Sequence, residues 1–217
     1  MKIYTDEEIV KFKEETIELL ESIDRDGKKD LKDYVVNKSD FLDCPSSTKY
    51  HGNHKHGLMI HSLNVMRELE NINERFNIGL SKDTMIITSL LHDLCKANIY
   101  KDSMKLRKNI EDKWEGYTTY EVVDTVPLGH GEKSIILAQQ FIHLTLEECC
   151  MIRYHMGGFL PKEMYNDMHK AMALYKGVSA LQIADQCASA FLETVVEPKI
   201  VTLEEYNRFI RNKKAGA

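Results

Sequence analysis

The sequence predicts an all-α protein, a helical bundle that is interrupted by one small β-hairpin insertion. Three observations lead to this fold class. Apolar residues recur three and four positions apart along most of the chain, which is the period of an amphipathic helix. Only 4 Pro and 11 Gly occur among the 217 residues, too few for a turn-rich β-sandwich. Hydrophobic residues make up 43% and charged residues 29%, which is ordinary for one globular domain of this length.

The first part of the chain, residues 1–50, is expected to form N-terminal helices. Apolar positions at helical spacing predict a helix over 9–23. A second, short helix is predicted over 31–41. The turn formers of 44–47 (CPSS) then break the chain, and residues 50–57 (YHGNHKHG) are expected to form a loop rich in histidine.

Two helices and an insertion are predicted for the middle of the chain. Residues 58–73 carry a clear apolar stripe, and a further helix is predicted over 83–97 with Ser81 as its N-cap. The helical period fades over 99–128. Within this stretch, the alternating pattern of 114–123 (WEGYTTYEVV) favours a small hairpin or a lid.

The helical pattern resumes after the insertion and continues almost to the end of the chain. The predicted helices run over 131–142, 146–155, 163–174 and 178–195. Residues 196–217 are expected to be a short tail with a solvated last helix. The prediction is therefore a single domain, residues 1–217, whose core spans 51–195.

Composition excludes several functional classes. The chain has 29 Lys and Arg against 34 Asp and Glu, a net charge of −5, so no overall positive field attracts nucleic acid. Five Cys, an odd number without a CxxC pair, indicate a reducing, cytoplasmic setting rather than a disulfide scaffold. No apolar run approaches the about 18 residues that would span a bilayer, and no signal-peptide core is present near the start.

Two polar residues lie within apolar helix stripes. Asp185 is in the middle of the stripe 178–192, and an isolated buried carboxylate is too costly to leave unpaired. Its partner is either a metal ion or a buried Arg or Lys. His61 lies in the stripe 58–72, where a histidine is either a metal ligand or a hydrogen-bonded core residue.

Three further histidines occur at helix ends or next to glycine. His92 and Asp93 are adjacent, so on a helix they point about 100° apart and can converge on an ion between them. Imidazole and carboxylate form a usual ligand mixture for Mn, Fe, Zn or Ni. His130 begins a predicted helix and His155 ends one; both can equally be capping or solvent-facing residues.

The order of these residues resembles the HD-domain metal-dependent phosphohydrolase superfamily. The pattern is a histidine, a His-Asp pair, two more histidines and an aspartate: His61, His92-Asp93, His130, His155 and Asp185. The surrounding segments GLMIHSLNV, SLLHDLCK, GHGEKS, RYHMGGF and ALQIADQ match as well. The resemblance covers roughly residues 55–193 and is to small bacterial or prophage-type HD hydrolases, with a more distant similarity to the HD domain of bacterial 3′–5′ exoribonucleases.

The resemblance implies an HD-type helical bundle with a site for divalent metal. One ion would be held by His61, His92, Asp93 and Asp185. A second would be held by His130 and His155 with Asp93 bridging, so two ions of Mn, Fe, Ni or Zn are expected, and Mg also fits. The chain departs from the family at Cys95, where glycine is common; this is either an oxidation-sensitive residue beside the metal or a small buried side chain.

The resemblance also implies a reaction. A metal-activated water would cleave a phosphomonoester or phosphodiester of a nucleotide or short oligonucleotide. Asp93 would orient the water and accept its proton, and Lys96, three residues further on, would contact phosphate. Two alternatives remain open, namely a di-iron oxygenase with the same ligands and a non-catalytic module that senses a nucleotide.

Other residues are candidates for binding a phosphorylated small molecule, a nucleotide or a short nucleic acid. Five cations face one acid in a basic stretch: Lys96, Lys101, Lys105, Arg107 and Lys108 against Asp102. His51, His54 and His56 can donate to phosphate, and Arg153 either contacts phosphate or forms a surface salt bridge. Trp114, Tyr117 and Tyr120 either stack on a base or form the core of the hairpin. No membrane partner is expected, and the oligomeric state is left open.

Overall fold

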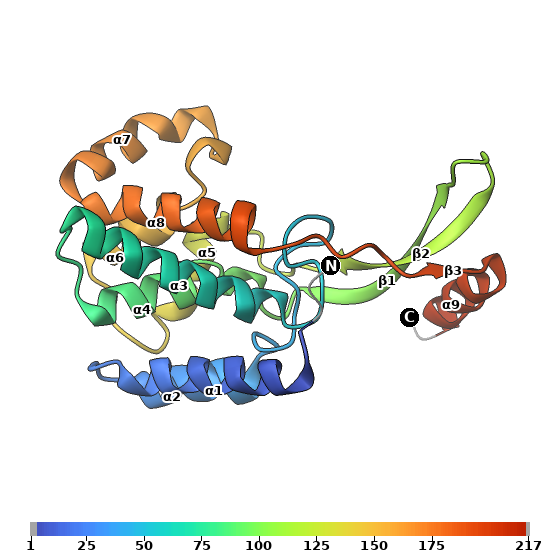
Figure 1. Ribbon diagram of the computed structural model, residues 1–217, viewed down its shortest axis with the longest axis horizontal. Helices are drawn as coiled ribbons and strands as arrows, with labels where there is room; N and C mark the ends of the chain where they lie inside the picture. The colour runs from blue at the N-terminus through green and yellow to red at the C-terminus, as the bar shows by residue number, and fades with distance from the viewer. Residues whose placement is uncertain (1–3, 216–217) are drawn as a thin grey trace.

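The computed structural model describes residues 4–215, and it confirms the predicted all-α fold class (Figure 1). The helices are α1 (Asp6–Ser22), α2 (Lys28–Asp33), α3 (Gly57–Phe76), α4 (Lys82–Leu91), α5 (His130–Ala138), α6 (Leu146–Tyr154), α7 (Tyr165–Leu174), α8 (Lys176–Cys187) and α9 (Leu203–Ala215). The strands are β1 (Tyr100–Lys108), β2 (Trp114–Val122) and β3 (Ile200–Val201). The outer ends of the predicted N-terminal region and tail, residues 1–3 and 216–217, lie outside the described residues.

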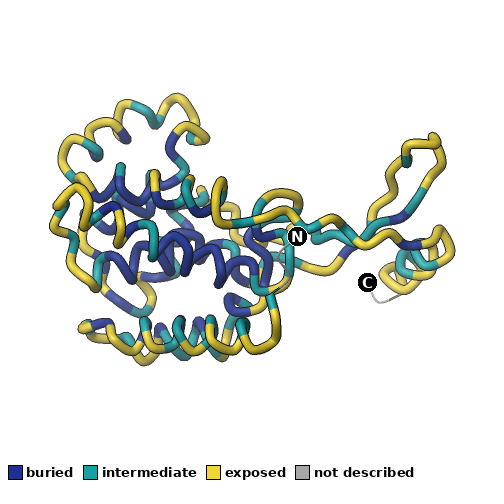
Figure 2. The backbone as a smooth tube through the Cα atoms, in the orientation of Figure 1, coloured by how far each residue is buried: buried dark blue, intermediate teal, exposed yellow. Residues whose placement is uncertain are grey.

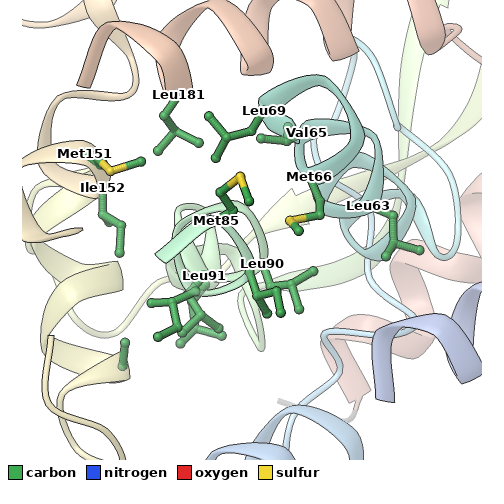
Figure 3. Packing of buried hydrophobic residues seen from close by; sticks show 14 of the residues in the cluster. Leu63, Val65, Met66, Leu69, Met85, Leu90, Leu91, Met151, Ile152 and Leu181 are labelled. Carbon is green, nitrogen blue, oxygen red and sulfur yellow. The ribbon is translucent and has the colours of Figure 1, made fainter. Parts of the chain in front are cut away.

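Helix α3 forms the centre of the bundle. It packs against α4 on one side and α8 on another, and its first ten residues, 57–66, are all buried (Figure 2). Side chains from four helices meet between them (Figure 3): Leu63, Val65, Met66 and Leu69 of α3, Met85, Leu90 and Leu91 of α4, Met151 and Ile152 of α6, and Leu181 of α8. Each fully buried side chain of this size contributes about 1.5–3 kcal/mol relative to exposure.

The start of α3 is fixed by a tight turn of the His-rich loop, residues 50–57. His56 has the left-handed φ of 68°, which ends the loop and begins the helix at Gly57. A Cβ on Gly57 would lie 2.0 Å from the carbonyl oxygen of Gly52, so only glycine allows this close approach. The predicted N-cap at Ser81 is confirmed for α4, where the Ser81 hydroxyl accepts from the Thr84 N–H at 3.1 Å.

The helix predicted over 83–97 ends early, whereas the helix predicted over 146–155 ends at Tyr154, and the same interaction is present at both ends. The helix predicted over 83–97 stops at Leu91 and is followed by a short 3₁₀ turn, because His92 Nδ1 lies 2.8 Å from the Ser89 carbonyl oxygen. In a continued α-helix, that oxygen would accept from the N–H four residues later. His155 Nδ1 lies 2.7 Å from the Ile152 carbonyl oxygen in the same way. Side-chain donors therefore replace the backbone donors at both helix ends.

The hairpin lies within the predicted insertion, residues 99–128, but it is longer than the segment 114–123 that favoured it. Strand β1 pairs antiparallel with β2 along its whole length, from Tyr100 opposite Val122 to Lys108 opposite Trp114. The cations of the basic stretch, except Lys96, therefore lie on a strand. The predicted tail also contains a strand, since β3 pairs with β2 at Gly116 opposite Val201. Helix α9 packs on β2. We call β1, β2, β3 and α9 the arm; it projects from the bundle and is mostly exposed (Figures 1 and 2).

The arm and the bundle meet beside the His-rich loop. The helix predicted over 178–195 ends as α8 at Cys187, continues through a π-helical turn at Ala188–Leu192 and then becomes extended. Asn53 holds this extended segment with two hydrogen bonds: its side chain donates to the Val196 carbonyl at 2.9 Å and accepts from the Val196 N–H at 2.7 Å. Among residues 4–215, no helix has both the length and the apolar character needed to span a membrane.

Candidate metal centre

The six side chains predicted to bind metal lie together in the bundle. Their positions are the beginning of α3 (His61), the end of α4 (His92 and Asp93), the first residue of α5 (His130), the end of α6 (His155) and the last turn of α8 (Asp185). We call these six residues the metal centre. Its ligand atoms form overlapping groups, within each of which all atoms lie within 4.8 Å of one another.

Asp93 lies at the middle of the metal centre. Its Oδ1 is 2.5 Å from His130 Nε2 and 3.6 Å from His155 Nε2. Its Oδ2 is 3.4 Å from His92 Nε2 and 3.6 Å from His61 Nε2. One carboxylate therefore faces all four imidazoles, with one oxygen toward each pair. This arrangement suits the bridging role that the family resemblance implies for Asp93.

The outer nitrogens of three histidines fix the orientation of their rings. His92 and His155 donate from Nδ1 to backbone carbonyls, and His61 Nδ1 lies 2.9 Å from Glu193 Oε1. A proton held on Nδ1 leaves the lone pair on Nε2, and each Nε2 faces Asp93. Metal-binding histidines are usually held in this way, with the outer N–H donated to a carboxylate or carbonyl.

One inner atom of the metal centre lacks the donor that it would need without a cation. His155 Nε2 is buried and has no hydrogen-bond partner among the described residues. The Nε2 atoms of His61 and His92 are 3.2 Å apart, although each is directed inward by its own Nδ1 contact. Four imidazoles and two carboxylates are a usual donor set for divalent transition metals. The metal centre therefore fits divalent metal.

Electrostatics within the centre also favour a cation. Burial opposes the protonated form of His61, yet the hydrogen bonds and charges of Asp185 and Glu193 raise its pKa to about 10. Asp185 Oδ1 lies 3.2 Å from His61 Nε2. Burial likewise opposes the ionised form of Asp93, but the charges of Lys96, His92 and His130 hold its pKa well below the ordinary value. The carboxylates thus remain ionised and attract positive charge.

Lys96, predicted to contact phosphate, lies at the edge of the metal centre. Its Nζ is 2.6 Å from Asp93 Oδ2, and 15% of its side chain is exposed. The neighbouring Cys95 is buried, and its Sγ lies 3.6 Å from His130 Nδ1. Burial and the charge of Asp93 raise the pKa of the Cys95 thiol to about 12, so it stays protonated. These properties favour the interpretation of Cys95 as a small buried residue.

The residues predicted to bind substrate are distributed over three other places. His56 Nδ1 contacts the Leu42 carbonyl at 2.7 Å, away from the metal centre. His54 lies in the His-rich loop with Nδ1 2.8 Å from the Lys55 carbonyl. Arg153 pairs with Glu132 at 2.5 Å, which is the salt bridge that the sequence left as the alternative. These three side chains therefore do not lie with the six residues of the metal centre, and their roles in substrate binding stay predictions.

Sequence reasoning missed Glu193 and placed His51 only loosely. The side chain of Glu193 is 3% exposed and holds His61 from behind, and Asn64 donates to the same carboxylate oxygen at 3.3 Å. The His51 ring lies 5.1 Å from the His61 ring. Spacing carries no signal for Glu193, because the eight residues that separate it from Asp185 include a π-helical turn and the start of an extended segment, so the two residues do not share a helix face.

This helical bundle holds a buried cluster of histidines and aspartates that could bind a divalent metal ion. Comparison with protein families identifies the class further, since the HD domain family model matches residues 58–190. The match includes all six residues of the metal centre and more than half of the chain, so the protein belongs to the HD domain family. No curated protein and no solved structure matches the chain.

Proposed function

We propose that this protein is a phosphohydrolase that cleaves a phosphomonoester or phosphodiester of a nucleotide or short oligonucleotide in the cytoplasm. Membership of the HD domain family suggests a metal-dependent hydrolase. The observation that carries the proposal is the position of Lys96, a cation at the edge of a metal centre whose central carboxylate it contacts. A lysine there favours a substrate with a phosphate group, whose negative charge it can bind.

Different residues of the chain contribute to different parts of the hydrolysis. Bound divalent ions would supply Lewis acidity and lower the pKa of a water molecule. The buried side of the metal centre is formed by His61, His92 and His155, whose side chains are each at most 1% exposed. Bulk solvent is therefore excluded from that side. Substrate approaches where exposure remains, at His130 and Asp185 with 34% and 18% of their side chains exposed. Lys96 binds the phosphoryl oxygens, and Asp93 orients the water.

A direct test uses purified protein and several divalent metals. We expect hydrolysis of an aryl phosphate ester or of a member of a nucleotide panel in at least one metal. Asp93→Ala should lower this rate about 10²-fold or more, because it removes the carboxylate that faces all four histidines. The control is Asp167→Ala, since Asp167 is 65% exposed and pairs with Lys170 on the same helix.

Melting curves of each variant accompany the rates, and Asp93→Asn, which keeps the shape of the side chain, replaces the alanine variant if that one fails to fold. An enzyme without activity on any phosphate ester in any metal would contradict the proposal. Consumption of O₂ by a two-iron form would instead assign the metal centre to oxidation.

A further inference from the structure

A pocket of about 770 Å³ lies where the arm joins the bundle. It is formed by three parts of the chain that are distant in sequence. They are the residues in and before the His-rich loop (48–49 and 53–55), the arm (102–104, 107, 117–120 and 209) and the segment 195–199. We call it the junction pocket. None of the six residues of the metal centre lines it, so it is a separate site.

The lining of the junction pocket combines aromatic rings with cations. Tyr117, Tyr120 and Phe209 contribute half-buried rings. Four cations and two acids, Asp102 and Glu197, line the pocket: Lys49, Lys55, Arg107 and Lys199. Lys55 pairs with Asp43 at 3.6 Å and Arg107 pairs with Glu115 at 2.8 Å. Lys49 and Lys199 form no ion pair within residues 4–215, so they are the cations available to an anionic ligand.

Arg107 and Tyr117 in the pocket are arranged like the cation and the aromatic ring of sites that bind single-stranded nucleic acid. The Arg107 guanidinium lies over the Tyr117 ring, 5.4 Å from its centroid. Aromatic rings on which bases stack, next to cations that follow the phosphates, are the usual features of sites for single-stranded nucleic acid. An acidic peptide would use the cations but would leave the exposed faces of the rings without a partner.

Two chains of contacts connect the junction pocket to the metal centre. Within the His-rich loop, His51 lies 5.1 Å from the His61 ring, and Asn53 and His54, two and three residues later, line the pocket. On the other side, Tyr100 follows Lys96 by four residues, and its ring lies 6.3 Å from that of Tyr120 in the pocket. The junction pocket is therefore next to the side of the metal centre that carries Lys96 and the His-rich loop.

We infer that the junction pocket binds the nucleotides adjacent to the scissile phosphate of a short single-stranded oligonucleotide. This inference rests on the proposed phosphohydrolase function and narrows its substrate from nucleotides in general to oligonucleotides. The bases stack on Tyr117 and Tyr120, and the phosphates lie against Lys49 and Lys199. A mononucleotide occupies the metal centre alone and lacks these contacts.

The test measures binding of fluorescently labelled hexanucleotides, as DNA and as RNA, to the full chain with its metal. We expect the double variant Lys49→Gln/Lys199→Gln to weaken binding at least about fivefold, and wild-type affinity to fall as salt is raised. The matched control is Lys29→Gln/Lys82→Gln, because both lysines are exposed on the bundle and neither lines the pocket. Melting temperatures confirm that each variant is folded.

A second variant tests stacking. Tyr117→Leu should weaken binding of a hexanucleotide at least about fivefold and leave binding of an abasic strand of the same length unchanged. Equal affinity of wild-type and pocket variants for the hexanucleotide would overturn the inference, as would equally tight, pocket-dependent binding of a polyglutamate peptide. The two proposals fail separately. Pocket-dependent binding without hydrolysis of any phosphate ester would reject the function alone, and hydrolysis without pocket-dependent binding would reject the pocket alone.

Discussion

Glu193 is the residue that holds His61 of the metal centre from behind. Its carboxylate holds the Nδ1 side of His61 at 2.9 Å, and Asn64 in turn fixes that carboxylate. This contact fixes the angle of the His61 ring and keeps its proton on Nδ1. If the ring turned, or if the proton moved to Nε2, the Nε2 lone pair would no longer be directed at Asp93. Glu193 is a positioning residue.

We expect Glu193→Gln to weaken divalent metal binding about 10–100-fold, since an amide is a poorer acceptor for the His61 N–H than a carboxylate. Titration calorimetry with Mn²⁺ or Zn²⁺ measures the effect directly and needs no substrate. Glu163→Gln serves as the control, because Glu163 is exposed before α7. Unchanged metal affinity in Glu193→Gln would mean that His61 is oriented by its packing alone.

Sequence was sufficient to select the six residues but not the groups that hold them. His61 and Asp185 were recognisable because a polar side chain within an apolar stripe requires a partner. Glu193 was not recognised, because the helix predicted over 178–195 includes it. In the structure the chain leaves the helix at the π-helical turn, so the Glu193 carboxylate comes from an extended segment. The metal and substrate roles of the individual residues stay predictions.

At the scale of elements, one buried carboxylate joins the beginnings of two helices to the turn after α1. Glu148 is fully buried and completes the capping box of α6 with Thr145. Both of its oxygens accept from Arg25, at 2.7 and 2.6 Å, and Thr84 of α4 donates to it at 3.0 Å. Burial opposes the ionised form, but these donors, Arg25 foremost, lower the pKa of Glu148 below its ordinary value.

Glu148→Gln should lower the free energy of unfolding by about 2 kcal/mol or more at neutral pH, because it leaves the Arg25 charge unpaired while glutamine can still cap the helix. A depressed pKa contributes stability that is present above the unfolded value of about 4.3 and is lost as pH falls through the folded value. Wild type should therefore lose more stability than the variant between pH 5 and pH 3. Urea titrations at several pH values test both statements.

Glu18→Gln is the control for this comparison, since Glu18 is exposed on α1 and should change stability by no more than about 0.5 kcal/mol. A Glu148→Gln variant with the stability and pH profile of wild type would contradict the assignment. Helix positions followed from apolar periodicity, and the N-cap of α4 and the bounds of α6 also agree with the prediction. The end of α4 does not, because the contact of His92 with the Ser89 carbonyl sets it, and a propensity argument does not contain that contact.

At the scale of the molecule, the bundle and the arm differ in how much of each is buried. Nearly all of the buried apolar side chains belong to the bundle, and in the arm only Ser103, Gly116 and Val201 are buried. Backbone hydrogen bonds without a buried apolar neighbourhood open at low free energy. The sequence predicted the insertion, but it did not predict that the tail would pair with it, because that contact joins segments about 80 residues apart.

We expect amide hydrogens of β1 and β2 to exchange with deuterium at least about a hundredfold faster than those of the first turns of α3. Hydrogen exchange followed by mass spectrometry resolves these segments in the intact chain. The exchange of α7, an exposed helix that belongs to the bundle, provides an internal comparison. Equal protection of the arm and α3 would show that the arm unfolds only together with the bundle.

The hydrogen bonds between Asn53 and Val196 have a topological consequence. These hydrogen bonds hold the two ends of the segment 53–196, which carries the metal centre, next to each other. A circular permutant of this segment, with residues 53 and 196 joined and with new ends at the exposed turn near Gly79, would keep the contacts among the helices of the centre. The helices would therefore reach the same arrangement even if they followed one another in a different order along the chain.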